Sequence, residues 1–100
     1  MPILLAVACN LASSSVAPAY TVKFSVGCEA VLHEDANEHY REYNKWWLMG
    51  YFTGRNYADD AEVGNGADDD QIYAIALRYC HDDPSKDWDD AALHTYDRMR

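Results

Sequence analysis

The longest periodic pattern in the chain begins at residue 29, where small and aromatic positions recur at alternating steps of four and three. This spacing predicts one face of a long α-helix reaching about residue 54, and we expect that face to be buried. It consists of Ala36, Tyr40, Tyr43, Trp47, Gly50 and Gly54. Glycine weakens a helix by up to about 1 kcal/mol relative to alanine, so Gly50 and Gly54 imply that a neighbouring segment needs their space. Charged residues occupy the opposite face at three-residue steps, which lets opposite charges meet on the solvent side.

A polar, glycine-containing stretch without periodicity covers residues 57–71 and predicts a loop. One of three aspartates near its end, Asp68, Asp69 or Asp70, is suited to cap the next helix, because a carboxylate accepts from the free amides of a helix N-terminus. That second helix is expected over about residues 71–80. Its apolar face consists of Ile72, Ile75, Ala76 and Tyr79.

A third helix is expected from about residue 88 to residue 99, after Pro84 has ended the second one. Ser85 or Asp87 would cap it. Its predicted buried face consists of Ala92, Leu93, Tyr96 and Met99. The helices should pack around a shared core of Trp47, Tyr51, Ile75, Tyr79 and Tyr96. Residues 20–26 are expected to be an extended lead-in rather than a strand, because a lone strand has no pairing partner.

Residues 1–19 have an apolar stretch followed by small residues that end in Ala-Pro-Ala, as in a secretory leader. The leader is atypical because no Lys or Arg precedes Lys23. One alternative for these residues is an N-terminal strand or a disordered arm. A second and less favoured alternative is a lipoprotein anchor at Cys9. We therefore expect a cleaved signal peptide over residues 1–19 and a single helical domain over residues 20–100.

Removal of Cys9 with the leader would leave two cysteines, Cys28 and Cys80, in an exported domain of about eighty residues. This even count predicts one disulfide, which would stabilise the fold by about 4 kcal/mol. The alternative is two buried reduced thiols in a cytosolic protein. Neither cysteine lies in a C-x-x-C pair, which weighs against redox catalysis and zinc binding.

The charge balance restricts the partners. The 100 residues include 17 acidic and 8 basic side chains, for a formal net charge of −9. Such a surface repels nucleic-acid phosphates and anionic lipid. The longest apolar runs are far shorter than the roughly 20 residues that span a bilayer. We expect no nucleic-acid binding and no membrane insertion.

Catalytic and metal-binding motifs are incomplete in the sequence. A metalloprotease helix would need a second histidine one turn after His33, and Asn37 stands there. The acidic loop does not fit the spacing of an EF-hand, and a looser calcium site would use Asp59, Asp60, Glu62 and Asp68. We interpret that loop instead as a solvated segment that ends in a helix cap. The protein is therefore expected to be no enzyme and to need no cofactor or metal.

Residues 28–96 contain an aromatic and glycine motif, followed by Tyr-Cys-x-x-x-Pro, that resembles a group of small exported helical proteins of Gram-negative bacteria. This group is related to the HdeA/HdeB acid chaperones and the Rap/Tai immunity proteins of type VI secretion. Besides the two cysteines, the resemblance is carried by Trp47, Gly50, Tyr51, Gly54, Asn56, Tyr79, Pro84 and Trp88. It implies an all-α periplasmic domain with a Cys28–Cys80 disulfide that binds rather than catalyses. The expected fold is a small disulfide-linked bundle of three helices, or four.

Two functions follow as hypotheses. The first is a periplasmic interaction protein of immunity or inhibitor type, whose mobile acidic loop blocks a basic protein partner such as a cell-wall hydrolase. The expected contacts are Asp59, Asp60, Glu62, Asp68, Asp69 and Asp70. The alternative is an acid-activated periplasmic chaperone, because protonation of all carboxylates would change the side-chain charge from −9 to +12 and loosen the helices. A homodimer is left open.

Overall fold

The computed structural model describes residues 26–100, and the expected leader, Cys9 and most of the lead-in lie outside them. These residues form an all-α domain, as predicted. Its four helices are α2 (Cys28–Glu34), α3 (Glu38–Asp59), α4 (Asp69–Asp82) and α5 (Trp88–Met99). Within the described range, none of the helices has the length and apolarity that crossing a membrane requires.

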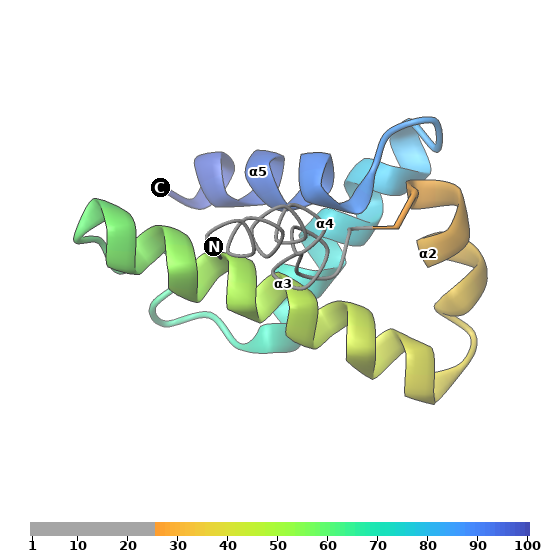
Figure 1. The fold of residues 1–100 in the computed structure, drawn as a ribbon, viewed down its shortest axis with the longest axis horizontal. Helices are drawn as coiled ribbons and strands as arrows, with labels where there is room; N and C mark the ends of the chain where they lie inside the picture. The colour runs from red at the N-terminus through yellow and green to blue at the C-terminus, as the bar shows by residue number, and fades with distance from the viewer. Residues whose placement is uncertain (1–25) are drawn as a thin grey trace, which may run out of the picture.

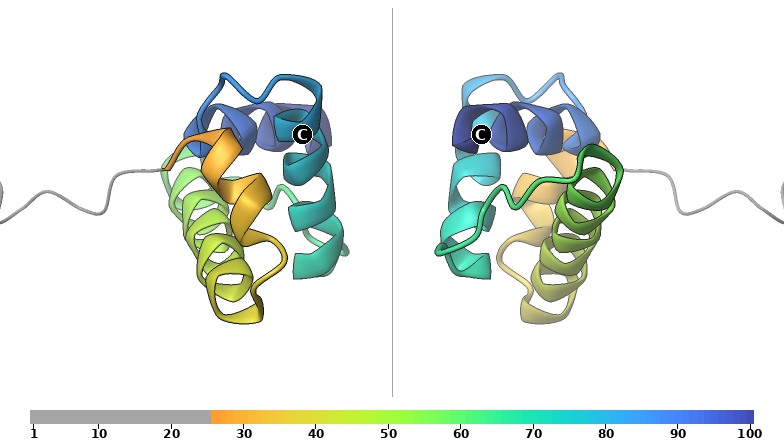
Figure 2. Two further views of the ribbon diagram at one scale, coloured as in Figure 1. Left: turned by 90° about the vertical axis from the view of Figure 1, so that its right-hand side faces the viewer. Right: turned by 90° about the vertical axis from the view of Figure 1, so that its left-hand side faces the viewer.

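Each helix packs against the other three, and Figure 1 shows α4 running between α3 and α5. Figure 2 shows α3 and α4 along two sides of the bundle. The start of α2 is tied to the start of α5 by backbone hydrogen bonds. The Cys28 N–H donates to the Lys86 carbonyl (2.8 Å), and the Trp88 N–H donates to the Val26 carbonyl (2.8 Å). The chain therefore enters the bundle beside the segment that connects α4 to α5.

The prediction of a single long helix from residue 29 is wrong, because the chain turns at residues 35–37 and forms two helices, α2 and α3. Asn37 caps α3, since its Oδ1 accepts from the N–H groups of His39 (2.9 Å) and Tyr40 (3.2 Å). The turn is fastened to α4, where the Tyr73 hydroxyl donates to Asp35 Oδ1 (2.6 Å). The helix also runs past Asn56 to Asp59, and Asp60 ends it in the left-handed conformation (φ 53°).

The buried face of α3 differs from the predicted one. It consists of Asn44, Lys45, Leu48 and Phe52. Tyr40 and Tyr43 are about half exposed, and a Cβ built on Gly50 or Gly54 would meet nothing within 4 Å. The polar members of the buried face have partners on other helices: Asn44 Nδ2 donates to Glu34 (2.9 Å), and the Asn44 carbonyl accepts from Trp88 Nε1 (3.1 Å). Apolar periodicity alone therefore selected the wrong side of this helix.

The two C-terminal helices lie close to their expected positions. Asp68 caps α4 by accepting from the Gln71 N–H (2.8 Å), and Gln71 Oε1 accepts from the Asp68 N–H in return (2.9 Å). The helix begins two residues earlier than predicted, at Asp69. The bounds of α5 are those predicted, and of the two expected caps Asp87 is the one used.

The buried faces of these helices are rotated from the predicted ones. In α4 the buried residues are Ile72, Tyr73, Ala76 and Cys80, whereas Ile75 and Tyr79 are only partly buried. In α5 Leu93 is 44% exposed, and Met99 is partly buried. The buried residues there are Trp88, Ala91, Ala92, Thr95 and Tyr96. Of the five expected core residues, Tyr96 alone is fully buried.

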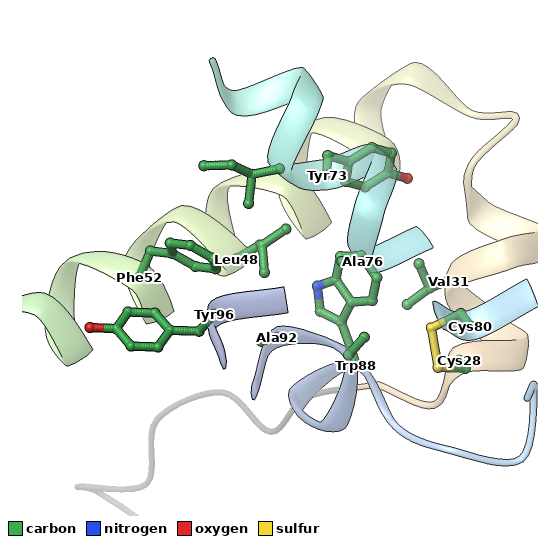
Figure 3. Close-up of a cluster of buried hydrophobic side chains, with 12 residues drawn as sticks. Cys28, Val31, Leu48, Phe52, Tyr73, Ala76, Cys80, Trp88, Ala92 and Tyr96 are labelled. Carbon is green, nitrogen blue, oxygen red and sulfur yellow. A yellow bond between two sulfur atoms is a disulfide. The ribbon is translucent and has the colours of Figure 1, made fainter. Parts of the chain in front are cut away.

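The core extends from the disulfide at one end to the Phe52–Tyr96 ring pair at the other, with Trp88 and Ala76 between them (Figure 3). Cys28 and Cys80 form the predicted disulfide, and both are fully buried. The bond joins the first residue of α2 to α4 across a sequence separation of 52. A closed loop of this length stabilises a fold by about 4 kcal/mol in the chain-entropy treatment.

Candidate functional site

A groove of about 370 Å³ lies between the C-terminal half of α3, residues 60–68 and the start of α4. Its apolar walls come from Met49, Phe52 and Ile72. Carboxylates of Glu62 and Asp69 lie among the lining residues, together with polar groups such as Thr53 and Asn65. The groove therefore combines an apolar wall with negative charge, which suits a ligand group that has an aliphatic stem and a basic end.

The loop of residues 60–68 is held in place by Asn56, a residue of the glycine and aromatic motif. Asn56 Nδ2 donates to the Val63 carbonyl (3.0 Å), and Asn56 Oδ1 accepts from the Val63 N–H (2.9 Å). The same oxygen accepts from the Tyr96 hydroxyl (2.8 Å), which joins the loop to α5. These bonds argue against the expectation of a mobile loop and give the groove a fixed wall.

Gly64 brings the loop onto the core. Its φ is +90°, a conformation that glycine adopts readily and other residues rarely. A Cβ at this position would lie 3.2 Å from carbon atoms of both Phe52 and Ile72. The close approach needs a glycine, and it sets the depth of the groove.

Lys45 belongs to α3 and lies beside the N-terminal end of α4, where its ammonium is surrounded by carboxylates. Its Nζ is 3.0 Å from Asp70 Oδ1, 3.0 Å from Glu42 Oε2 and 3.6 Å from Asp69 Oδ2. The hydrogen bonds to Asp70 and then Glu42 raise the pKa of Lys45 above its ordinary value. Its side chain is only 8% exposed. Three carboxylates around one ammonium leave an excess of two negative charges beside the groove.

The six carboxylates predicted to bind a partner have different environments. Asp59 pairs with Arg55 (3.4 Å), and Asp68 caps α4. Asp69 and Asp70 surround Lys45. Asp60 and Glu62 are exposed on the loop, where Glu62 Oε1 accepts from Asn65 Nδ2 (3.2 Å). Only Glu62 and Asp69 of the six line the groove, so the acidic segment is divided between structural contacts and an accessible edge.

The motif residues mostly support the helix packing. Trp47 stacks on Tyr51 (ring centroids 6.0 Å apart), and Tyr51 meets the edge of Tyr96 (6.4 Å). Arg55 lies over the Tyr96 ring at 4.4 Å and donates to the Tyr51 hydroxyl (3.0 Å). These contacts extend the core along α3.

The remaining motif residues lie at the junction of α4 and α5 or on the open side of α3. Tyr79 lies 4.8 Å from the His94 ring, and Trp88 is buried in the core. Pro84 is exposed in the connection between the two helices. Gly50 and Gly54 contact no neighbouring segment among residues 26–100, which overturns the expectation that one needs their space.

Sequence reasoning missed Lys45, because a single lysine on a charged helix usually lies in solvent. It also missed the exposure of Trp46, which is 59% accessible. The acid-rich stretch after residue 67 gave the only available signal for Lys45, since a buried ammonium needs carboxylate partners. Across residues 26–100, one group of three carboxylates lies close enough to share a cation, and it consists of Asp87, Asp89 and Asp90. It lies at the start of α5, where the Asp87 N–H donates to Asp90 Oδ2 (3.0 Å).

Comparison of the chain with protein-family models, curated proteins and solved structures gives no match. The groove, the Lys45 cluster and the surface of α3 are therefore interpreted from their own geometry.

Proposed function

We propose that this protein is an exported, non-catalytic interaction protein of immunity or inhibitor type, which binds a basic segment of a protein partner in the groove beside α3. The observation that carries the proposal is the lining of the groove, which includes the apolar residues Phe52 and Ile72 and the acidic residues Glu62 and Asp69. A lysine or arginine side chain can lay its aliphatic stem on such apolar atoms while its charged end pairs with a carboxylate.

The charge distribution supports the same class of partner. The chain has a net charge of −9, and Asp60 and Glu62 are exposed on the loop that forms one wall of the groove. Part of this charge is concentrated at the Lys45 cluster, where three carboxylates surround one ammonium. Long-range attraction would accelerate the encounter with a cationic protein, and the bound complex would weaken as salt screens these charges.

Export to the periplasm is part of the proposal. It is supported by the buried Cys28–Cys80 disulfide, a bond that persists in oxidising compartments and is rare in the cytosol. The apolar pattern of residues 1–19 is consistent with a leader. Intact mass of the protein recovered from the periplasm would measure where the mature chain begins.

The proposal is tested by titrating the protein against a lysozyme, used as a basic cell-wall hydrolase, and by affinity capture from periplasmic extract at low salt. The variant Asp60→Asn with Glu62→Gln should bind about tenfold more weakly, since it removes the Glu62 charge from the groove lining and the Asp60 charge from the same loop. Asp82→Asn with Asp97→Asn makes the same charge change elsewhere and serves as the matched control. Equal affinities of the two double variants for every basic hydrolase captured would contradict the groove as the binding site.

An acid-activated chaperone is the second proposed function, and a specific contact favours it. Asp35 accepts the Tyr73 hydrogen bond that fastens the turn between α2 and α3, and carboxylates surround Lys45. At low pH the side-chain charge of the chain would change from −9 to +12, and the resulting self-repulsion would weaken the bundle while the disulfide keeps it from separating. Binding of a hydrophobic dye should then rise between pH 7 and pH 2, and an unchanged signal would eliminate this function.

A further inference from the structure

The outward side of α3 carries most of the exposed large hydrophobic side chains of residues 26–100. Four of the five large hydrophobic side chains that are exposed there belong to this helix. They are Tyr40 (50%), Tyr43 (48%), Trp46 (59%) and Tyr57 (91%). Residues 43–58 contain no Asp or Glu, although the chain has 17 of them in 100 residues. We call this side of α3, from Tyr40 to Tyr57, the aromatic face.

We propose that the aromatic face is the contact surface of a homodimer, in which α3 packs antiparallel against α3 of a second copy about a twofold axis near Gly50. An interface of this kind uses the same surface of both copies and closes on itself. It goes beyond the proposed function, since Trp46, Tyr40, Tyr43 and Tyr57 do not line the groove.

The exposed area is sufficient for such an interface. With about 200 Å² as the accessible area of a free tyrosine or tryptophan side chain, the four aromatic residues present roughly 500 Å² per copy. Two copies would then bury about 1,000 Å², which is the minimum expected of a specific interface. Aromatic side chains are also the residues that contribute most of the affinity at interface centres.

Electrostatics favour a second copy over a basic partner at this face. Two chains of charge −9 repel each other, and the cost is smallest where the facing surfaces carry the fewest carboxylates. A basic protein would find no carboxylate between Tyr43 and Ala58 to pair with. The relative direction of the two α3 helices also follows from charge, because a parallel pair would bring Asp59 and Asp60 of both copies together at one end. An antiparallel pair centred on Gly50 separates Asp59 and Asp60 of the two copies and places Asp59 of one copy opposite Arg41 of the other.

The side chains also fit this arrangement. In an antiparallel pair centred on Gly50, Trp46 of one copy lies opposite Gly54 of the other, and Tyr43 lies opposite Tyr57. A Cβ at Gly50 or Gly54 would meet nothing within 4 Å in the single chain, so these positions leave room for a facing indole ring. Small residues that let helices approach closely opposite large ones are a common basis of helix pairing.

The test is sedimentation equilibrium of the full chain from about 1 µM to about 200 µM, a range that spans the affinities of interfaces of this size. We expect a reversible dimer. Trp46→Glu should raise its dissociation constant at least about 30-fold, because it places a carboxylate at the centre of the contact. Leu93→Glu is the matched control, since Leu93 is an exposed hydrophobic residue on α5 (44%) and should leave association unchanged.

Gly54→Leu is a second variant that does not depend on the folding of Trp46→Glu. A side chain at residue 54 has open space in the single chain, so the thermal unfolding of this variant should not fall while its association weakens. The salt dependence distinguishes dimer formation from binding in the groove. Screening should tighten the dimer of two negative chains and weaken the complex with a basic partner.

A monomer at every concentration would overturn the proposal. If Trp46 were also shielded from an aqueous quencher at 1 µM, the face would be covered by another part of the same chain. A dimer that tolerates both Trp46→Glu and Gly54→Leu would likewise place the contact elsewhere. Loss of lysozyme or hydrolase binding would not affect these outcomes, because they measure association of the protein with itself.

Discussion

The hydroxyl group of Tyr73 donates a 2.6 Å hydrogen bond to Asp35, across 38 residues of sequence. This contact connects the middle of the bundle to the turn that separates α2 from α3. Burial, and then the hydrogen bond to Asp35, raise the pKa of the Tyr73 phenol above its ordinary value. The hydrogen bond therefore holds the turn against α4, and the Tyr73 phenol that donates it has a different pKa in the folded and unfolded chains.

Removing this bond should destabilise the protein. Tyr73→Phe keeps the buried ring and loses a hydrogen bond to a charged acceptor, and we expect the free energy of unfolding to fall by about 1.5–3 kcal/mol at pH 7. Urea unfolding followed by circular dichroism measures the loss. Tyr57→Phe is the control, because Tyr57 is 91% exposed, and an equal loss in both variants would contradict the assignment.

The stability should also decline at alkaline pH. The folded-state pKa values of Tyr73 and Lys45 lie above their unfolded values, so both contributions are complete below about pH 10 and are lost as the pH rises further. The free energy of unfolding should therefore decrease above pH 10, and Tyr73→Phe should show a shallower decrease than the wild type. An identical slope in the two proteins would show that Tyr73 does not have a raised pKa.

Lys45 should matter more for stability than its position on a charged helix suggests. Lys45→Met leaves Glu42, Asp69 and Asp70 close together without their ammonium, so the variant should unfold at a lower temperature than the wild type at pH 7. Lys86→Met, at an exposed position, is the comparison variant and should change the melting temperature less.

Two glycine substitutions should have opposite effects. Gly64→Ala introduces a Cβ at φ +90° that lies 3.2 Å from Phe52 and Ile72, and we expect a loss of more than about 1 kcal/mol. Gly54→Ala adds a Cβ in open space within a helix, and we expect a gain of about 0.5–1 kcal/mol at concentrations where the chain is monomeric. Denaturant titrations of the two variants under identical conditions give the comparison, and a shared sign would contradict it.

The disulfide should account for a large part of the stability. Replacing Cys28 and Cys80 together by alanine should lower the free energy of unfolding by about 4 kcal/mol, because the unfolded chain regains the freedom of a 52-residue loop. The variant should then behave like the reduced wild type. A small change on reduction would instead show that packing around Val31 and Ala76 dominates at this end of the core.

The prediction of the helices succeeded where local chemistry determines the result. Pro84 and Asp87 mark the start of α5, and Asp68 with Gln71 forms a reciprocal cap for α4. Asn37 is an equally good cap, but it lies within a continuing three- and four-residue period that predicts one unbroken helix. Periodicity therefore outweighed a capping signal that determines the true boundary.

The candidate site was only partly predictable, because its geometry depends on contacts between helices. Lys45 and Asn44 are buried by partners on α4, α5 and α2, and no local pattern reveals such partners in advance. Tyr40 and Tyr43 of the apolar stripe assigned to the core lie instead on the exposed aromatic face, whereas Trp47 packs partly buried against the core. The acidic loop was found from composition, but its attachment through Asn56 depends on Tyr96, forty residues away in sequence.

The position of the sulfur bridge also determines what proteolysis would release. Cys28 and Cys80 close a ring of chain that contains all of α3 and the loop before α4, whereas α5 lies outside that ring. A protease cut between α3 and α4 would produce two fragments that stay joined until a reductant is added. A cut between α4 and α5 would free the C-terminal fragment at once, carrying Trp88 and Tyr96 away from the core.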